Sequence, residues 1–190
     1  LSGVDLVTFS GDKMLGGPQA GIIAGRSQIL GRVRKHPLMR ALRPDKMTLA
    51  ALEATLRQVL AGEIEAIPTI SMISTPPEIL LSKAKALARR LQRSSPDFSF
   101  TIVEAEDAVG GGSLPEIPLP GYAVAVTHPR LSSGWLQKKL REAPSPVIAT
   151  SREKAVLLHV RTIRKSDVDM IVKALSTTGS GVEVLHESFP

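Results

Sequence analysis

Residues 78 to 175 alternate between apolar runs of helical spacing and short strand-like runs, and this alternation limits the fold more than any other feature of the sequence. Leucine and alanine recur every three or four residues in the helical runs, while valine, isoleucine and phenylalanine dominate the short runs. The order helix–strand–strand–helix–strand–strand–helix predicts a small α+β domain, with helices on one face of a mainly antiparallel sheet. The expected helices cover 78–93, 132–141 and 166–175, and the expected strands cover 98–105, 122–127, 147–150 and 155–160.

The first 66 residues have a different pattern. Residues 4–9 read as a buried strand that ends in a glycine-rich turn, and residues 20–25 read as a second strand. A helix over 28–35 and a longer helix from Thr48 to about residue 61 follow. We therefore expect an α/β class fold with the end of a large α/β domain over 1–66 and a small domain over 67–190. Because Leu1 stands so close to an expected strand, we expect a fragment of a longer protein.

Composition excludes several classes of protein. Hydrophobic residues make up 43% of the chain, which is enough for a core. No apolar run approaches the roughly 18 residues of a membrane span, and without a targeting segment the cytoplasm is the default location. Cysteine is absent, and the four histidines stand in unrelated contexts. We therefore expect neither disulfides nor a metal site.

Positive charge is concentrated near the start of the chain. The formal net charge is +6, and residues 26–46 contain seven Lys or Arg and one acid. A solvated helix face and an anion site, for phosphate groups or nucleic acid, both fit this composition. Aromatic residues make up only 3% of the chain, so a base-stacking surface is not expected.

Lys13 lies in the glycine-rich turn that follows the first expected strand. One interpretation is an ordinary surface lysine, and a second is a phosphate-binding loop. The order of glycines and Lys-Ser/Thr in a P-loop is not met, since Met14 follows the lysine. A third interpretation is a Schiff-base lysine, because partial burial would favour the neutral, nucleophilic amine. Spacing alone does not choose between the first and the third.

Three blocks of sequence resemble the bacterial selenocysteine synthases, the L-seryl-tRNA(Sec) selenium transferases. Residues 5–23 (DLVTFSGDKMLGGPQAGII) are similar to the segment that carries the pyridoxal 5'-phosphate (PLP) lysine of that family. Residues 36–56 (HPLMRALRPDKMTLAALEATL) and 110–115 (GGGSLP) resemble later blocks, in the same order. Met14 and Pro44 are small departures.

The resemblance implies a fold-type-I PLP-dependent transferase that converts seryl-tRNA(Sec) to selenocysteinyl-tRNA(Sec) through an aminoacrylyl intermediate. Lys13 would bind PLP and move the Cα proton, with Asp12 either orienting the lysine or serving only as a turn residue. Arg40 and Arg43, three residues apart, would project from one side of a helical turn and bind selenophosphate. The family also implies dimers assembled into a larger ring. The large-domain segments that complete the pocket are absent, so we expect the 190-residue chain alone to be inactive.

Two other functions stay open at this point. A related PLP-dependent lyase acting on a small phosphorylated substrate would share the lysine loop. A basic nucleic-acid-binding domain without catalysis would account for the charge. The arginine block and the GGGSLP motif favour the selenium transferase, and a Schiff-base absorbance that borohydride fixes on Lys13 would separate catalysis from binding alone.

Overall fold

The computed structural model describes residues 3–109 and 118–180 and divides the chain into two units. The first unit runs from Leu1 to Ser74 with Val109–Pro115, and the second takes the remaining residues. The division follows Ser74, whereas the sequence suggested a boundary between residues 66 and 67. The reason is the apolar side chain of Ile67, which is buried against the loop that contains Gly16. Segment 67–74 therefore packs with the first unit.

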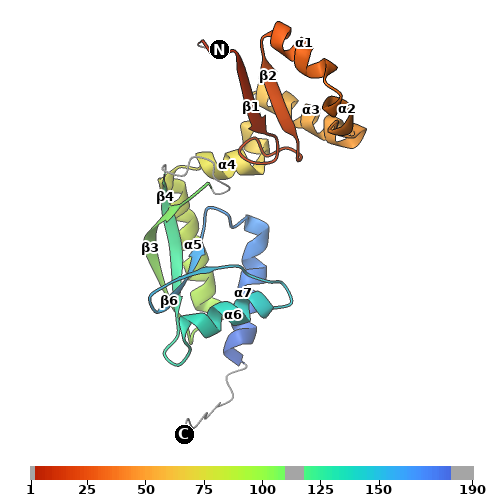
Figure 1. Cartoon of the computed structure of the whole chain (residues 1–190). Coiled ribbons are helices and arrows are strands. Elements are labelled where there is room, and N and C mark those ends of the chain that lie inside the picture. Colours follow the sequence, from red (N-terminus) through yellow and green to blue (C-terminus); the bar gives the residue numbers. More distant parts are fainter. Residues whose placement is uncertain (1–2, 110–117, 181–190) are drawn as a thin grey trace. The chain divides into compact units, whose positions relative to one another are not determined.

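The first unit contains an antiparallel two-stranded ribbon and a series of helices (Figure 1). The ribbon pairs Leu6 with Gly25 and Ser10 with Gly21. Its turn holds Lys13, and its second strand continues into the first helix. The elements are β1 (Leu6–Ser10), β2 (Gly21–Gly25), α1 (Ser27–Lys35), α2 (Leu38–Ala41), α3 (Lys46–Leu60), the 3-10 turn η1 (Ile64–Ala66) and α4 (Pro68–Ser74).

The ribbon is not buried, although the apolar composition of residues 4–9 predicted a buried strand. Phe9 is 45% exposed, and none of the helices α1 to α4 contains a buried residue. A two-stranded ribbon offers each residue few neighbours, and a strand becomes buried only when a layer packs on its faces. Among the described residues no such layer covers β1.

Asp45 caps α3, which begins at Lys46, whereas the sequence suggested a start at Thr48. The Asp45 carboxylate accepts hydrogen bonds from the backbone N–H groups of Met47 and Thr48, at 2.7 and 3.0 Å. The Thr48 hydroxyl donates to the same carboxylate. These donors, the Thr48 backbone N–H first, lower the pKa of Asp45, because they stabilise its charged form. At the other end Gly62 has the positive φ of 77° that was expected for a glycine following the helix.

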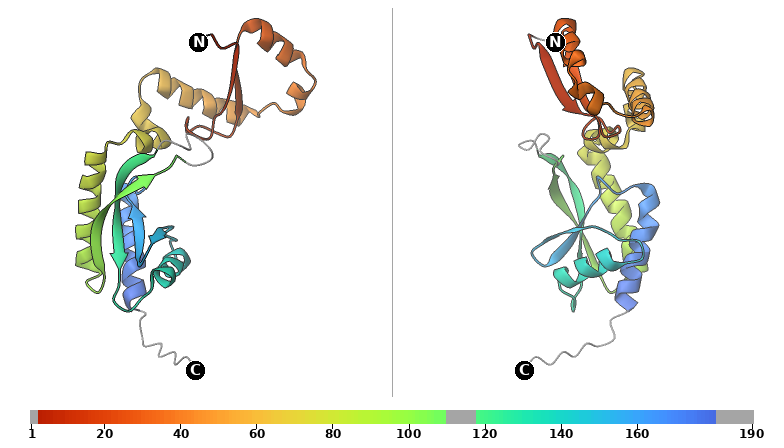
Figure 2. Two further views of the ribbon diagram at one scale, coloured as in Figure 1. Left: turned by 60° about the vertical axis from the view of Figure 1, so that its left-hand side comes forward. Right: turned by 45° about the vertical axis from the view of Figure 1, so that its right-hand side comes forward.

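The second unit is a four-stranded antiparallel sheet with three helices (Figure 2). The strand order is β3-β4-β6-β5, and β3 pairs with β4 from Ser99↔Thr127 to Asp107↔Leu119. The antiparallel sheet predicted from the sequence is confirmed. Its elements are α5 (Pro77–Ser94), β3 (Ser99–Asp107), β4 (Leu119–Thr127), α6 (Ser133–Glu142), β5 (Thr150–Arg152), β6 (Ala155–His159), the 3-10 turn η2 (Lys165–Asp167) and α7 (Val168–Ser180).

One face of this sheet forms the main core. Alternate residues of a strand point to opposite faces, so Val124 and Val126 of β4 lie on the same face as Leu158 of β6, and α5, α6 and α7 pack against them. The opposite face has small side chains, including Ala123 and Ala125. The completely or almost completely buried large side chains are Leu80, Leu91, Leu136, Leu140, Leu175, Val124, Val126, Val156 and Val160.

Two helix starts differ from the sequence predictions. Thr75 and Glu78 have the spacing of a capping box, but α5 begins with Pro77 after Pro76, and no side chain caps it. Proline needs no cap at the first helical position because it has no N–H. The last helix was expected to begin at residue 166, but α7 begins at Val168, and the hydrogen bonds before it join Arg164 and Asp167. The hydrogen bond from the Arg164 side chain lowers the pKa of Asp167.

Arg161 joins four segments of the second unit. Its side chain is 5% exposed and donates from Nε to Asp107 at 2.8 Å. It also donates to the backbone carbonyl of Pro120 at 2.7 Å and to that of Thr75 at 3.3 Å. The end of β3, the start of β4 and the segment before α5 therefore meet at one guanidinium group. An arginine suits this position because its planar group has five donors in fixed directions.

Replacing Arg161 should destabilise the second unit. Arg161→Met would leave the Asp107 carboxylate almost buried without its guanidinium partner, and breaking a buried pair in this way costs about 3–5 kcal/mol. Chemical denaturation of the chain, followed by circular dichroism, measures this loss. Arg130→Met, at an exposed loop position, is the matched control and should change the free energy of unfolding by less than about 0.5 kcal/mol. Equal stability of the two variants would contradict the stabilising role of the Arg161 contacts.

Candidate active site

The loop between β1 and β2 is closed by its own backbone. The Gly11 N–H donates to the Ala20 carbonyl at 2.8 Å, and the Gly11 carbonyl accepts from the Gly17 N–H at 2.8 Å. The Lys13 carbonyl accepts from the Gly16 N–H at 3.0 Å. These bonds fix the backbone on both sides of Lys13. The lysine therefore projects from a defined turn at the end of β1.

Two glycines make this closure possible. Gly16 has φ of 72°, a region in which side chains are strained, and a Cβ there would lie 2.7 Å from a methyl group of Ile67. At Gly11 a Cβ would lie 2.8 Å from the Pro18 carbonyl oxygen. Larger residues at either position would push the loop open. The two glycines are thus required by geometry.

Lys13 lines a pocket of about 570 Å³ within the first unit. This volume falls in the range of about 300–1,000 Å³ found for small-molecule sites. Apolar side chains from the loop and from α4 make up most of its wall. The lining residues are Phe9, Ser10, Lys13, Met14, Leu15, Ile70, Ile73 and Ser74.

The structure does not bury Lys13, although partial burial was expected for a nucleophilic lysine. Its side chain is exposed, as is that of Asp12 beside it. The Asp12 carboxylate makes no hydrogen bond or ion pair with any residue that the structure describes.

Arg40 and Arg43 do not share a helical turn, contrary to the prediction. Helix α2 ends at Ala41, and Arg43 lies in the irregular segment between α2 and α3. The cause is Pro44, because the residue before a proline is disfavoured in helical conformation. Both guanidinium groups are exposed and belong to the same unit as Lys13. They form no ion pair with an acid among residues 3–109 and 118–180.

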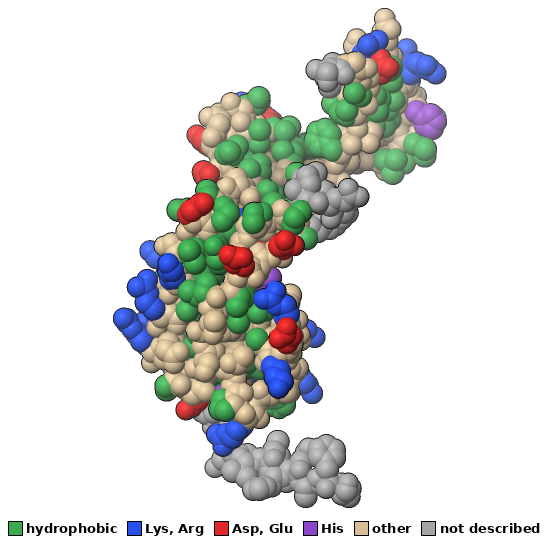
Figure 3. Space-filling model, turned by 90° about the vertical axis from the view of Figure 1, so that its left-hand side faces the viewer, with side chains coloured by type: hydrophobic (Ala, Val, Ile, Leu, Met, Phe, Trp, Pro, Cys, Tyr) green, Lys and Arg blue, Asp and Glu red, His purple; other side chains and the backbone are tan. Residues whose placement is uncertain are grey.

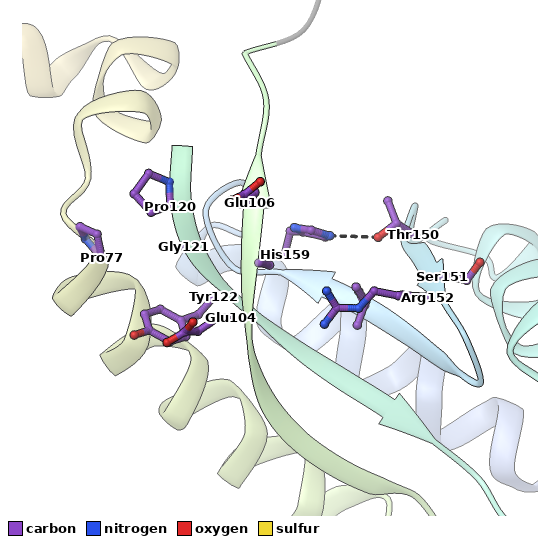
Figure 4. Close-up of a pocket in the computed structure, with 12 residues that line it drawn as sticks. Pro77, Glu104, Glu106, Pro120, Gly121, Tyr122, Thr150, Ser151, Arg152 and His159 are labelled. Atoms are coloured by element: carbon purple, nitrogen blue, oxygen red, sulfur yellow. Dashed lines mark hydrogen bonds between the residues drawn. The ribbon is translucent and has the colours of Figure 1, made fainter. Parts of the chain in front are cut away.

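A second pocket, of about 790 Å³, lies in the second unit (Figure 4). Here His159 Nε2 is 2.9 Å from the Thr150 hydroxyl, and Nδ1 is 2.7 Å from the Asp107 carboxylate. Sequence reasoning missed this group because 52 residues separate Asp107 from His159. Only the antiparallel pairing of β3, β4 and β6 brings them together, and no spacing in the sequence indicates it.

The described residues contain no cluster of three or more His, Cys, Asp or Glu suited to a metal ion. In the same residues, every helix is too short or too polar to cross a membrane. The glycine run 110–112, expected to belong to the small domain, lies outside the residues that the structure describes.

Comparison with known proteins decides the family. A family model described as L-seryl-tRNA selenium transferase matches residues 1–164. The chain belongs to this family. The chain is 46% identical over 173 residues to the L-seryl-tRNA(Sec) selenium transferase of Clostridium botulinum strain Hall, and 43% identical over 173 residues to that of Aquifex aeolicus. The matches cover 90% and 91% of this chain and 37% and 38% of those relatives. The chain thus spans little more than a third of their length.

The fold also matches a solved structure at low sequence identity. The structure of D-glucosaminate-6-phosphate ammonia-lyase aligns with a TM-score of 0.61 and 16% identity, covering 94% of this chain and 44% of that one. A likeness at this identity supports the α/β fold with antiparallel sheets and carries no information about substrate. The family membership and the fold therefore rest on separate comparisons.

Replacing Gly16 tests whether the closed loop geometry holds the backbone around Lys13. Gly16→Ala forces an alanine into a left-handed conformation and against Ile67, so the free energy of unfolding of the first unit should fall by about 1–3 kcal/mol. Gly21→Ala is the matched control, because its Cβ would meet no atom within 4 Å. Hydrogen exchange at the amides of residues 11–20 reports the opening of the loop. Unchanged exchange in Gly16→Ala would refute the steric argument.

Proposed function

We propose that this chain carries the PLP-binding lysine of a selenium transferase that converts seryl-tRNA(Sec) to selenocysteinyl-tRNA(Sec) with selenophosphate. The observation that carries the proposal is Lys13 itself, at the closed turn after β1 and on the wall of an apolar pocket, in a chain whose family model covers residues 1–164. In domain terms, the first unit corresponds to the end of a fold-type-I large domain and the second unit to the small C-terminal domain.

The pocket residues suit PLP. The apolar side chains of Phe9, Leu15 and Ile70 can contact a planar ring, and the Lys13 amine is the group that forms an imine with an aldehyde. When bound, PLP supplies an electron sink that stabilises negative charge at the Cα of the seryl group. Lys13 holds the cofactor through its amine between turnovers. Once released, the same amine is placed to move the Cα proton, with Asp12 beside it.

Arg40 and Arg43 are proposed to bind selenophosphate. This donor is a small anion, and a guanidinium group binds such oxygens through charged, directional hydrogen bonds. Both side chains are exposed and without an acidic partner among the described residues, so their charge is available to a ligand. Because Arg43 lies outside α2, the two groups approach the anion from a helix and from an irregular segment.

Oligomerisation would account for the exposed apolar surface of the first unit. Leu42, Met47 and Leu60 are 72%, 80% and 87% exposed. Exposed apolar side chains gathered on one unit mark a surface that another surface covers. The proposed dimers, assembled into a larger ring, provide such a cover, together with the parts of the relatives that extend beyond the matched region.

The role of Lys13 can be tested by chemical trapping. In the full-length protein carrying this sequence, PLP should give a Schiff-base absorbance that borohydride reduction fixes on Lys13, as read by peptide mass spectrometry. Lys13→Ala should abolish the absorbance and lower conversion of seryl-tRNA by more than about 100-fold, the contribution of a positioned acid–base group. Lys46→Ala, another exposed lysine of the first unit, should retain both. Trapping at a different lysine would disprove the assignment.

The role of the two arginines can be tested by kinetics. In the full-length protein, Arg40→Ala and Arg43→Ala should each raise the KM for selenophosphate by roughly 10-fold or more, because each removes a charged hydrogen bond worth about 1.5–3 kcal/mol. The Schiff-base absorbance should remain. Arg32→Ala and Arg34→Ala, on α1, control for the removal of exposed charge. Loss of the absorbance together with activity would show that the arginines serve the cofactor and not the selenium donor.

A further inference from the structure

Helix α5 has a row of basic residues on the side that faces away from the core. Lys85, Arg89 and Arg93 are exposed and follow each other at intervals of four residues. The opposite side of the same helix is buried through Leu80, Ala84, Leu87 and Leu91. Lys and Arg side chains gather along this edge of the second unit (Figure 3), where the left-hand view of Figure 2 places α5 on the outside. We name Lys85, Arg89 and Arg93 the basic row.

The geometry of the helix sets the spacing of these charges. Residues four apart lie on nearly the same side of an α-helix, with a rise of about 1.5 Å per residue. The three positive groups are therefore about 6 Å apart along the axis and span about 12 Å. Such a row is linear and open. It does not converge on a point, as the groups around a small anion would.

No acid among the described residues neutralises the charges of the basic row. Arg90, on the neighbouring side of α5, forms an ion pair with Asp169 at 3.1 Å. Lys85, Arg89 and Arg93 have no acidic partner among the described residues, and the Arg89 Nε donates only to the Lys85 carbonyl, at 3.2 Å. Solvated helix faces usually mix both signs of charge. Glu78, in the first turn, is the one acid of α5.

We propose that the basic row contacts consecutive phosphates of the tRNA substrate, and this inference rests on the function proposed above. A regular line of positive charge complements a polyphosphate backbone, which dominates the affinity of proteins for nucleic acids. No Phe, Tyr or Trp lies on α5, so the contact positions the backbone and does not stack bases. A membrane surface would require large apolar side chains beside the charges. Leu80, Leu87 and Leu91 are buried in the protein core, and the exposed Ile79 lies in the first turn of α5, ahead of the basic row.

Removing the three charges should weaken tRNA binding and its salt dependence. In the full-length protein, Lys85→Gln/Arg89→Gln/Arg93→Gln keeps good helix formers and should lower the affinity for a tRNA(Sec) transcript by at least about tenfold in dilute salt. The slope of log K against log salt should become shallower by about 2–3, since each lost phosphate contact contributes about 0.7–0.9. Fluorescence anisotropy between 50 and 200 mM salt, roughly the range over which such contacts weaken, measures both quantities.

A matched variant separates the basic row from net charge. Lys138→Gln/Lys139→Gln/Arg141→Gln removes the same number of charges from α6 of the same unit, and it should leave affinity and slope unchanged. Arg89→Lys/Arg93→Lys keeps the charge and should retain the slope. Thermal unfolding verifies that each variant is folded, and the single variant Arg89→Gln, with an expected loss of slope of about 0.7–0.9, replaces the triple variant if that fails to fold.

Three results would overturn the inference. The first is unchanged tRNA binding in the α5 variant, and the second is an equal loss of tRNA binding in the α6 variant. The third is an α5 variant that loses binding to vesicles of phosphatidylcholine and phosphatidylserine while it keeps its tRNA binding. None of these measurements depends on PLP. The failure of the proposed catalytic function would appear instead as an absent Schiff base at Lys13, with tRNA binding still measurable.

Discussion

The second unit depends on the burial of one face of its antiparallel sheet. Val124, Val126 and Leu158 present that face, and α5, α6 and α7 cover it. This packing fixes which side of each helix faces the sheet, because the apolar side of a helix turns toward the core and its polar side toward solvent. The same constraint decides which side chains remain outside. The basic row of α5 faces solvent because Leu80, Leu87 and Leu91 occupy the core.

The first unit is organised by backbone hydrogen bonds more than by a core. Its helices contain no buried residue, and Ile67 is the one buried apolar side chain that joins α4 to the loop. The position of Lys13 follows from Gly11, which bonds to both Ala20 and Gly17. This arrangement gives the lysine a rigid base while leaving its side chain open to the pocket.

The sequence predicted much of the fold, and it failed in specific places. Helical spacing and strand alternation depend on local chemistry, so the antiparallel sheet of the second unit could be predicted. Helix starts were less certain. At α3 and before α7 the side chains of Asp45 and Asp167 accept the free backbone N–H groups, because the acceptors near a helix end compete for the same few donors. At α5 the proline at the first helical position makes a side-chain cap unnecessary. The prediction that Arg40 and Arg43 share a helical turn was wrong for a local reason as well, because a proline follows Arg43.

By itself the sequence determined the family, the lysine loop and the order of elements, since these depend on residue identity and near-neighbour spacing. Only the tertiary structure decided that Asp107, His159 and Arg161 meet, because they lie on strands whose pairing no local pattern encodes. It also decided that Phe9 and Lys13 are exposed among the described residues, and that segment 67–74 belongs with the first unit. Burial and long-range contact are properties of packed layers, and a sequence specifies them only through the fold.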